Sequence, residues 1–319
     1  MAPGGSWVLD PSVMIGYNAS ADPARTAQPS DFLDGWHAAW QPRDCRLRLY
    51  DPAEATRAFE GKHFLVIGDS TTHMLMAIMM ELILGKEAFR YPTNGWELCG
   101  HNNRVYDSGD MLFPMRFSFL WAGSSHYCDN NRGLPHLLEG NEGEGLARFQ
   151  RGLGKDVDFV VMNAGAHDIG GAVPLEEYDR LLPSTFDLVL NASSSVRARP
   201  ERMLWRSTTA HVYNTGDWNA GIHWMNWIAE RHARSRGFGI LDSHQMWAAD
   251  TDLRRANGSP MPDQVYCGDG LHGRGGRNVG TKEKERWITF YCDKLYAEAA
   301  VAVHHFMQLA LEGGRTKTK

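Results

Sequence analysis

Short apolar segments with β-branched and aromatic residues alternate with longer helix-like segments through most of this chain. The segments typical of strands are residues 64–67, 116–121, 158–163, 202–207 and 238–241. Helices are expected at residues 71–84, 143–152, 174–192 and 218–236, with one or two more at residues 281–311. Strands that alternate with helices form a parallel sheet covered on both faces. The sequence therefore predicts an α/β fold, a three-layer α/β/α sandwich with a mainly parallel central sheet.

The composition and the apolar runs argue against two classes of binding partner, nucleic acid and membrane. A net charge of -5 provides no basic excess for nucleic acid or for an anionic membrane surface. The longest apolar run, residues 74–84, contains Glu81 and is shorter than the about 20 residues that cross a bilayer. Residues 1–5 do not resemble a signal peptide. We therefore expect neither nucleic-acid binding nor a transmembrane segment.

The cysteines do not indicate a metal site. None of the five forms a C-x-x-C pair, which argues against structural zinc. An odd number leaves at least one thiol free if the others pair, and the sequence leaves the pairing open. The five are Cys45, Cys99, Cys128, Cys267 and Cys292.

The triplet Gly68-Asp69-Ser70 follows the first expected strand and precedes a helix. A serine at this place is often only an N-cap, whose side chain accepts a backbone N–H. It is also a good place for a nucleophile, because the N-terminus of a helix stabilises an oxyanion forming beside it. Asp69 is expected to fix the turn. The choice between the two interpretations of Ser70 depends on whether a base is available to activate its hydroxyl.

A candidate base lies near the C-terminus, in Asp269-Gly270-Leu271-His272. A spacing of three lets the Asp269 carboxylate orient the His272 imidazole and stabilise it when protonated, as a Ser-His-Asp triad requires. Because an early G-D-S is combined with a late D-x-x-H on an α/β pattern, the catalytic interpretation of Ser70 is favoured over the cap.

These motifs resemble those of the GDSL/SGNH hydrolase superfamily, which also has a central G-x-[N/H]-D block, here residues 163–168. Residues 36–51 and the segment from Trp205 to Gly221 are similar to the "WRWQP..C.LPRFD" and "R..SP.HF..GDWN.GG" patterns of PC-esterase domains. That family includes the trichome birefringence-like polysaccharide O-acetyltransferases. The resemblance runs from about residue 5 to about residue 300. It implies an SGNH-hydrolase-like fold and acyl transfer through an acetyl-serine.

The resemblance also bears on the oxyanion hole, to which Ser70 would contribute its backbone N–H. The third residue after the nucleophile is His73, where the family usually has arginine. Family spacing points to Asn163 as a side-chain donor, and superfamily spacing points to His167. We therefore list His73, Asn163 and His167 as candidate donors and leave the choice open.

The function implied by the resemblance is O-acetylation of a glycan, with a carbohydrate acceptor and an acetyl donor as co-substrate. No cofactor or metal is expected. The alternatives are a carbohydrate acetylesterase and a non-catalytic glycan-binding module. Four residues are candidates for contacting substrate: Gly165, Arg206, His211 and Trp218.

The domain organisation follows from the same comparison. We expect residues 1–50 to form an irregular N-terminal wrap, residues 51–312 the SGNH/PC-esterase catalytic domain, and residues 313–319 a polar tail. The resemblance implies work in the secretory pathway, in the Golgi lumen, or outside the cell, although no signal or anchor is visible in the sequence. The oligomeric state is left open.

Overall fold

The structure is a computed structural model. It describes residues 5–9, 38–42, 47–48, 50–85, 104–106, 115–121, 133–135, 157–170, 173–191, 193–209, 217–247, 274–279, 286–291 and 293–315. The helix expected at residues 143–152 lies outside the described residues.

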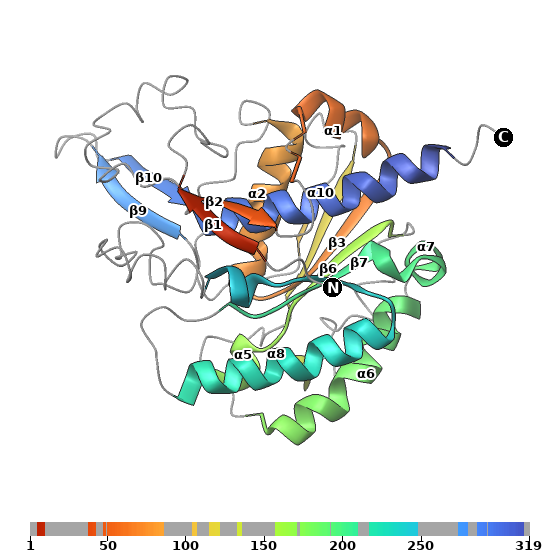
Figure 1. The fold of residues 1–319 in the computed structure, drawn as a ribbon, viewed down its shortest axis with the longest axis vertical. Helices are drawn as coiled ribbons and strands as arrows, with labels where there is room; N and C mark the ends of the chain where they lie inside the picture. The colour runs from red at the N-terminus through yellow and green to blue at the C-terminus, as the bar shows by residue number, and fades with distance from the viewer. Residues whose placement is uncertain are drawn as a thin grey trace.

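A six-stranded sheet forms the centre of the molecule, in the order β4-β5-β3-β6-β7-β8 (Figure 1). Five strands are parallel to one another, and the edge strand β4 (Arg104–Tyr106) runs antiparallel to β5. The parallel strands are β3 (His63–Gly68), β5 (Arg116–Trp121), β6 (Phe159–Met162), β7 (Met203–Arg206) and β8 (Gly239–Leu241). The five strands expected from the sequence are confirmed, with ends shifted by no more than one residue.

The central strands are apolar along their whole length because both of their faces are covered. Every residue of β3, β6 and β7 is buried. Buried parallel strands have continuous apolar sequences for this reason, without the alternation of a half-exposed strand. Two apolar cores result, one on each side of the sheet.

One face of the sheet is covered by α1 (Pro52–Ala58), α2 (Ser70–Leu84) and α10 (Asp293–Arg315) (Figure 1). α2 lies deep in this layer, and eleven of its fifteen residues are buried. They include four methionines, which fill irregular gaps well: Met74, Met76, Met79 and Met80.

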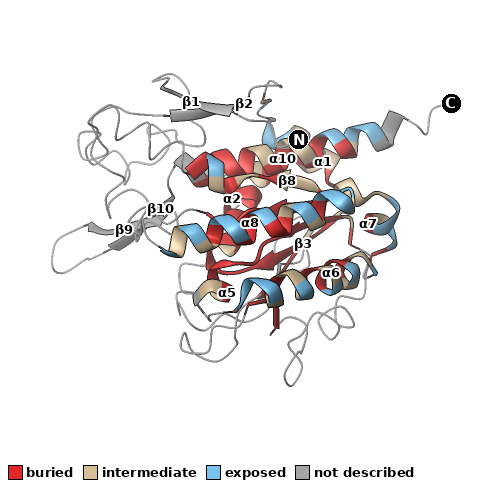
Figure 2. Ribbon diagram, turned by 60° about the horizontal axis from the view of Figure 1, so that its bottom comes forward, coloured by how far each residue is buried: buried red, intermediate tan, exposed pale blue. Residues whose placement is uncertain are grey.

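The other face is covered by α5 (Ala166–Gly170), α6 (Leu175–Asn191) and α8 (Asp217–Ser235), with the short α7 (Ser194–Ala198) and the 3-10 turn η3 (Pro200–Arg202) at one end. α6 and α8 have a buried stripe toward the sheet and an exposed stripe toward solvent (Figure 2). In α6 the stripe recurs at helical spacing, as Tyr178, Leu182, Phe186 and Val189. The predicted three-layer α/β/α sandwich is confirmed.

Two segments differ from expectation. Within the region expected to be irregular, β1 (Gly5–Leu9) and β2 (Ala38–Pro42) pair as an antiparallel sheet. Near the C-terminus, β9 (Arg274–Val279) pairs antiparallel with β10 (Arg286–Tyr291), so the expectation of helix is wrong at residues 286–291, and α10 begins at Asp293. The sequence of β10, Trp-Ile-Thr-Phe-Tyr after Arg286, consists of β-branched and aromatic residues, which favour strands.

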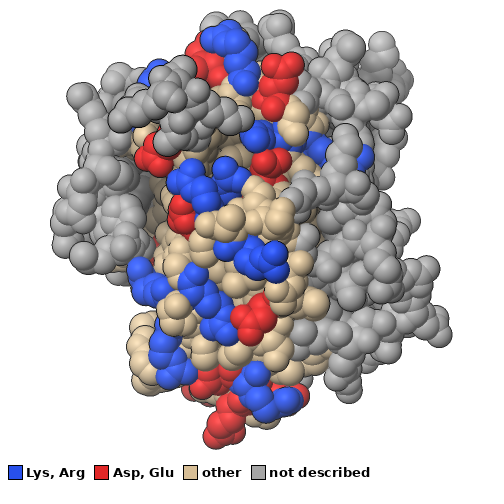
Figure 3. All heavy atoms as spheres, turned by 90° about the vertical axis from the view of Figure 1, so that its right-hand side faces the viewer, with Lys and Arg blue, Asp and Glu red and all other residues tan. Residues whose placement is uncertain are grey.

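The surface carries both signs of charge. On the face shown in Figure 3, basic and acidic side chains are interspersed. No helix in the described part of the chain combines the length and apolar character that crossing a bilayer requires.

Candidate active site

The turn between β3 and α2 presents Ser70 as the first residue of the helix. The N-cap is Asp69, whose Oδ1 accepts hydrogen bonds from the backbone N–H of Thr71 at 2.9 Å and of Thr72 at 3.2 Å. The prediction that Asp69 fixes the turn is confirmed. Because Asp69 caps the helix, capping does not account for the serine beside it. Ser70 is largely buried and keeps 8% of its surface exposed.

Gly68 allows this turn to be tight. A Cβ atom at residue 68 would lie 2.5 Å from both Cβ and Oγ1 of Thr72. Atoms at that distance overlap, so a side chain at residue 68 would push the strand away from the first turn of α2. The glycine of the G-D-S motif is therefore required by the close approach of strand and helix.

Ser70 lies where ligands bind in open parallel sheets. β3 has β5 on one side and β6 on the other, so the chain switches direction across the sheet at β3. Such switch points open a crevice outside the carboxyl ends of the strands. Ser70 follows the carboxyl end of β3, Trp121 ends β5, and His167 follows β6.

His167 lies at this edge of the sheet, in the short helix α5. It is half-buried, and its imidazole meets the Trp121 ring edge to face, with 5.2 Å between ring centroids. Burial by itself raises the pKa of the Asp69 carboxyl. This rise is outweighed by four groups that together lower the pKa below its usual value: His167, the Thr71 hydroxyl, Arg206 and the Thr72 N–H. The nucleophile turn is thus flanked by a buried carboxylate that stays ionised.

His73 lies one turn after Ser70 on α2 and is also half-buried. Its ring stacks on that of Phe119 from β5, with 4.4 Å between centroids and 29° between planes. The stacking fixes the plane of the imidazole against the sheet.

Asn163 occupies a different environment from the two histidines. Its side chain is fully buried, and Nδ2 donates to the Arg206 carbonyl oxygen at 2.9 Å and to Thr208 Oγ1 at 3.1 Å. Asn163 therefore joins the carboxyl ends of β6 and β7, and both of its amide N–H groups are used in these two bonds.

Gly165 is held in a conformation that favours glycine, with φ of +144°. A Cβ there would lie 2.5 Å from Thr208 Oγ1, which itself donates to the Ala164 carbonyl oxygen at 3.0 Å. The backbone of the segment after β6 is therefore pressed against the segment after β7. Asn226 of α8 fixes Thr208 from the other side, accepting from its N–H at 2.7 Å.

Asp168, in the same segment, is a buried carboxyl group. Its Oδ1 accepts from the Leu134 N–H at 2.8 Å, and Oδ2 is so closely packed that a Cβ on Gly133 would lie 2.0 Å from it. Burial raises the pKa of Asp168 to about 7, although hydrogen bonds from the backbone of Leu134, Gly165 and Asp168 itself lower it. Asp168 ties residues 133–135 to the segment that carries His167.

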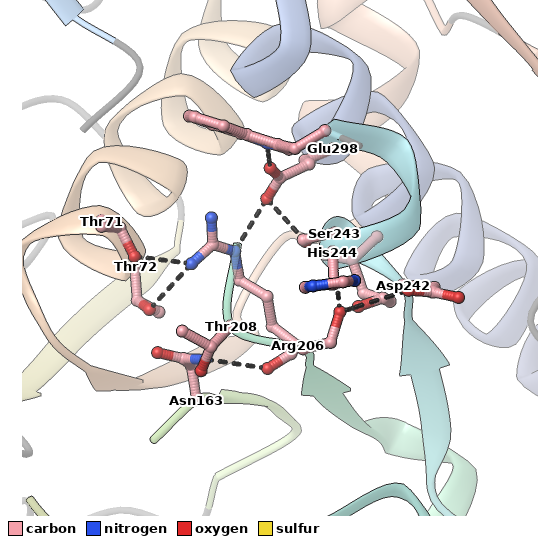
Figure 4. Close-up of polar contacts among 12 residues, drawn as sticks. Thr71, Thr72, Asn163, Arg206, Thr208, Asp242, Ser243, His244 and Glu298 are labelled. Atoms are coloured by element: carbon pink, nitrogen blue, oxygen red, sulfur yellow. Dashed lines mark hydrogen bonds and ion pairs between the residues drawn. The ribbon is translucent and has the colours of Figure 1, made fainter. Parts of the chain in front are cut away.

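Arg206, expected from the sequence to contact substrate, is fully buried. Its guanidinium lies between Glu298 of α10 on one side and Thr71 and Thr72 of α2 on the other (Figure 4). Arg206 Nε donates to Glu298 Oε2 at 2.7 Å, and Nη1 donates to Thr71 Oγ1 at 2.7 Å. The side chain therefore contacts the helix of the proposed nucleophile from inside the protein.

The remaining predicted residues divide into two groups. Trp218 is half-buried in the first turn of α8. Asp269, His272 and His211 lie outside the described residues, so the triad and the contact of His211 with substrate stay predictions. Among the residues that the structure describes, no three His, Cys, Asp or Glu side chains are grouped so that they could hold a metal ion.

Thr71 and Glu298 contribute to the site but were not singled out from the sequence, and Asp168 was named only as the last residue of the central motif. Glu298 carried a usable signal, since it is the one charge in the small apolar run from Ala297 to Val303. A lone charge in such a run on a helix is expected to have a buried partner. The partner itself, Arg206, lies 92 residues away.

Comparison with known proteins yields structural neighbours only. No family model matches the chain, and no curated protein matches it. The acetylxylan esterase Axe2 from Geobacillus stearothermophilus is 10% identical with a TM-score of 0.41, covering 79% of this chain and 94% of that one. A member of the lipolytic G-D-S-L family from Veillonella parvula is 10% identical with a TM-score of 0.38, covering 76% and 96%.

A third solved structure, the α/β hydrolase LAE5 from the metagenome of Lake Arreo in Spain, is 17% identical with a TM-score of 0.36, covering 76% of this chain and 95% of that one. The neighbours are thus described as hydrolases or esterases of α/β or GDSL type. At such identities and TM-scores, the activity of this chain has to be inferred from its own residues.

Proposed function

We propose that this chain is an acyl-transfer enzyme that forms an acyl-serine at Ser70. The observation that carries the proposal is the position of Ser70, at the first turn of α2, after the central strand β3, beside the switch point of the sheet. The partial positive charge of the helix N-terminus favours an oxyanion formed there. The role of N-cap is filled by Asp69, so Ser70 is not needed to cap the helix.

His272 is the proposed base, oriented by Asp269. The pairing of β9 with β10 supports this role. Arg274 comes two residues after His272 in the chain, and it pairs with Tyr291, just before α10 begins at Asp293. Glu298, in the second turn of α10, reaches the nucleophile helix through Arg206 and Thr71. The β9–β10 hairpin therefore returns the chain to the end of α10 that adjoins α2.

In the proposed reaction, Ser70 Oγ attacks the acyl carbonyl while the His272 imidazole takes its proton. The tetrahedral intermediate then expels the leaving alcohol, which receives that proton, and an acyl-serine remains. The Ser70 N–H and His167 are the proposed oxyanion donors, with His73 as a further candidate. His167 is favoured over Asn163 because it is half-buried whereas Asn163 is fully buried. Both amide hydrogens of Asn163 are also used in bonds inside the protein.

The proposed acyl group is acetyl and the proposed acceptor a carbohydrate hydroxyl, following the resemblance of the sequence to PC-esterase domains. Gly165, His211 and Trp218 are the proposed contacts for substrate, and the secretory pathway or the cell exterior is the proposed location. Hydrolysis of acetylated carbohydrate uses the same acyl-serine, with water as the acceptor. Transfer prevails only when the bound acceptor is aligned well enough to outcompete water.

The proposal is tested by mass spectrometry of a xylan or mannan oligosaccharide incubated with the protein. One reaction contains an acetyl donor and an unacetylated oligosaccharide, and the other contains an acetylated oligosaccharide alone. We expect acetyl gain in the first if the chain is a transferase and acetyl loss in the second if it is an esterase. Ser70→Ala is expected to abolish either change.

A further inference from the structure

A continuous buried network of polar side chains connects α10 to the nucleophile turn. Trp247 Nε1 and Ser243 Oγ donate to the carboxylate of Glu298, which accepts from Arg206 Nε at 2.7 Å. Arg206 Nη1 donates to Thr71 Oγ1, and Thr71 Oγ1 donates to Asp69 Oδ1 at 2.6 Å. None of these side chains is more than 4% exposed.

The direction of every hydrogen bond in this network is determined by chemistry. A guanidinium has only donors, and an ionised carboxylate has only acceptors. The Thr71 hydroxyl must therefore accept from Arg206 and donate to Asp69, which leaves it one orientation. The Asp69 Oδ1 that accepts from the Thr71 hydroxyl also accepts from the backbone N–H groups of Thr71 and Thr72, and so caps α2. The conformation at the start of α2 is thereby coupled to the position of Arg206.

Arg206 is itself held from several sides. Its backbone carbonyl accepts from Asn163, and its side chain is fixed by Glu298, which α10 carries. The Arg206 guanidinium lies between two buried carboxylates. It donates directly to Glu298, and it is connected to Asp69 through the Thr71 hydroxyl. Buried charges require such pairing, and a pair of this kind specifies one arrangement of the elements that carry it.

We propose that Arg206, supported by Glu298, is a positioning residue that orients Ser70 through Thr71 and Asp69. It acts from within the protein and touches neither substrate nor the reacting atoms. This inference rests on the proposed function of Ser70. It replaces the expectation that Arg206 binds substrate with a role in holding the nucleophile turn.

The test uses Thr71, the uncharged side chain that connects Arg206 to Asp69. Thr71→Val removes the hydroxyl at constant shape, and Thr71→Ser restores it. Thr185→Val is the matched control, because Thr185 is also fully buried and donates one hydrogen bond, to the Leu181 carbonyl, but lies on α6 across the sheet. For each full-length variant, one measures the rate and affinity of inactivation by a fluorophosphonate, kcat and KM for p-nitrophenyl acetate, and Tm.

We expect Thr71→Val to lower the maximal inactivation rate and kcat by about 10- to 100-fold, the loss expected when a reacting group shifts by about 1 Å. KM and the affinity for the fluorophosphonate should stay unchanged. Thr71→Ser should recover most of the rate, and Thr185→Val should react as the wild type does. Glu298→Gln, which keeps the shape of its side chain, should show the same kinetic loss as Thr71→Val.

The positioning role is overturned if Thr71→Val and Glu298→Gln react at the rate of Thr185→Val. It is also overturned if their losses appear only in Tm or in KM. A wild-type protein that the fluorophosphonate does not modify would contradict the proposed function itself. The two failures are therefore distinguishable in one experiment.

Discussion

Arg206 Nε lies 2.7 Å from Glu298 Oε2, and neither side chain has any exposed surface. Removal of one partner from a buried ion pair leaves an uncompensated charge. We expect Arg206→Met to lower the free energy of unfolding by about 3–5 kcal/mol, and the double variant Arg206→Met, Glu298→Met to lose less than the sum of the single variants. Urea unfolding measures both.

The control for this prediction is a pair at the surface, in which Arg234 is exposed and Glu230 is half-buried. Arg234 and Glu230 lie one turn apart on α8, with 3.1 Å between Arg234 Nη2 and Glu230 Oε2. Arg234→Met should cost no more than about 1 kcal/mol. Equal losses for Arg206→Met and Arg234→Met would contradict the importance given to the buried pair.

His167 and Asn163, two of the three candidate oxyanion donors, should respond differently to truncation. His167→Ala is expected to lower kcat by about 10² to 10³, the usual effect of removing one oxyanion donor, with little change in Tm. Asn163→Ala should instead cost about 1–3 kcal/mol of stability, because it leaves the Arg206 carbonyl without a donor inside the protein. Kinetics with p-nitrophenyl acetate and thermal unfolding distinguish them, and the reverse pattern would show that Asn163 is the donor.

Asp168 should make stability fall as the pH rises. Its pKa is raised to about 7 in the folded protein from 3.8, so the folded state holds more protons than the unfolded state between these values. Stability is then highest below about pH 4 with respect to this group, and it decreases until about pH 7. The loss amounts to at most about 4 kcal/mol.

Asp168→Asn removes this titration and keeps an oxygen that can accept from the Leu134 N–H. We expect the difference in unfolding free energy between pH 5 and pH 8 to be smaller in the variant than in the wild type. Urea unfolding at the two pH values measures it. An unchanged difference would mean that Asp168 is already ionised at pH 5.

Gly165 and Gly61 allow backbone strain to be separated from steric overlap. Both have positive φ, but a Cβ at residue 61 would meet nothing within 4 Å, whereas one at residue 165 would meet Thr208 Oγ1. Gly61→Ala should cost about 1–2 kcal/mol from strain alone. Gly165→Ala should cost more and should also slow catalysis, because it displaces the segment that carries His167. Equal costs in urea unfolding would contradict the close packing described here.

The sequence predicts those parts of the molecule that depend on local pattern. The parallel strands β3, β5, β6, β7 and β8, the α2 and α8 helices, and the capping by Asp69 follow from apolar runs and turn residues that are neighbours in the chain. The pairing of Arg206 with Glu298 does not, because it depends on how a strand and a helix 92 residues apart are packed. Likewise, the sequence marks Asn163 as polar at the end of a strand, but only the fold determines that its amide faces inward.

The expectation of helix at residues 286–291 was wrong for a related reason. Residues 286–291 were grouped with the strongly helical segment that follows, although their β-branched and aromatic residues favour a strand. The partner strand, Arg274–Val279, contains two glycines and three polar or charged residues, so it has little strand signal of its own. Pairing across the hairpin, rather than local preference, determines the structure there.

The most direct test of the account is whether Ser70 is an activated nucleophile. The full-length protein and its Ser70→Ala and His272→Ala variants are treated with a fluorophosphonate, and the modified peptide is identified by mass spectrometry. We predict a single adduct on Ser70 in the wild type, none at that peptide in Ser70→Ala, and much slower labelling in His272→Ala. An unmodified wild-type Ser70, as expected of a non-catalytic glycan-binding module, would contradict the account.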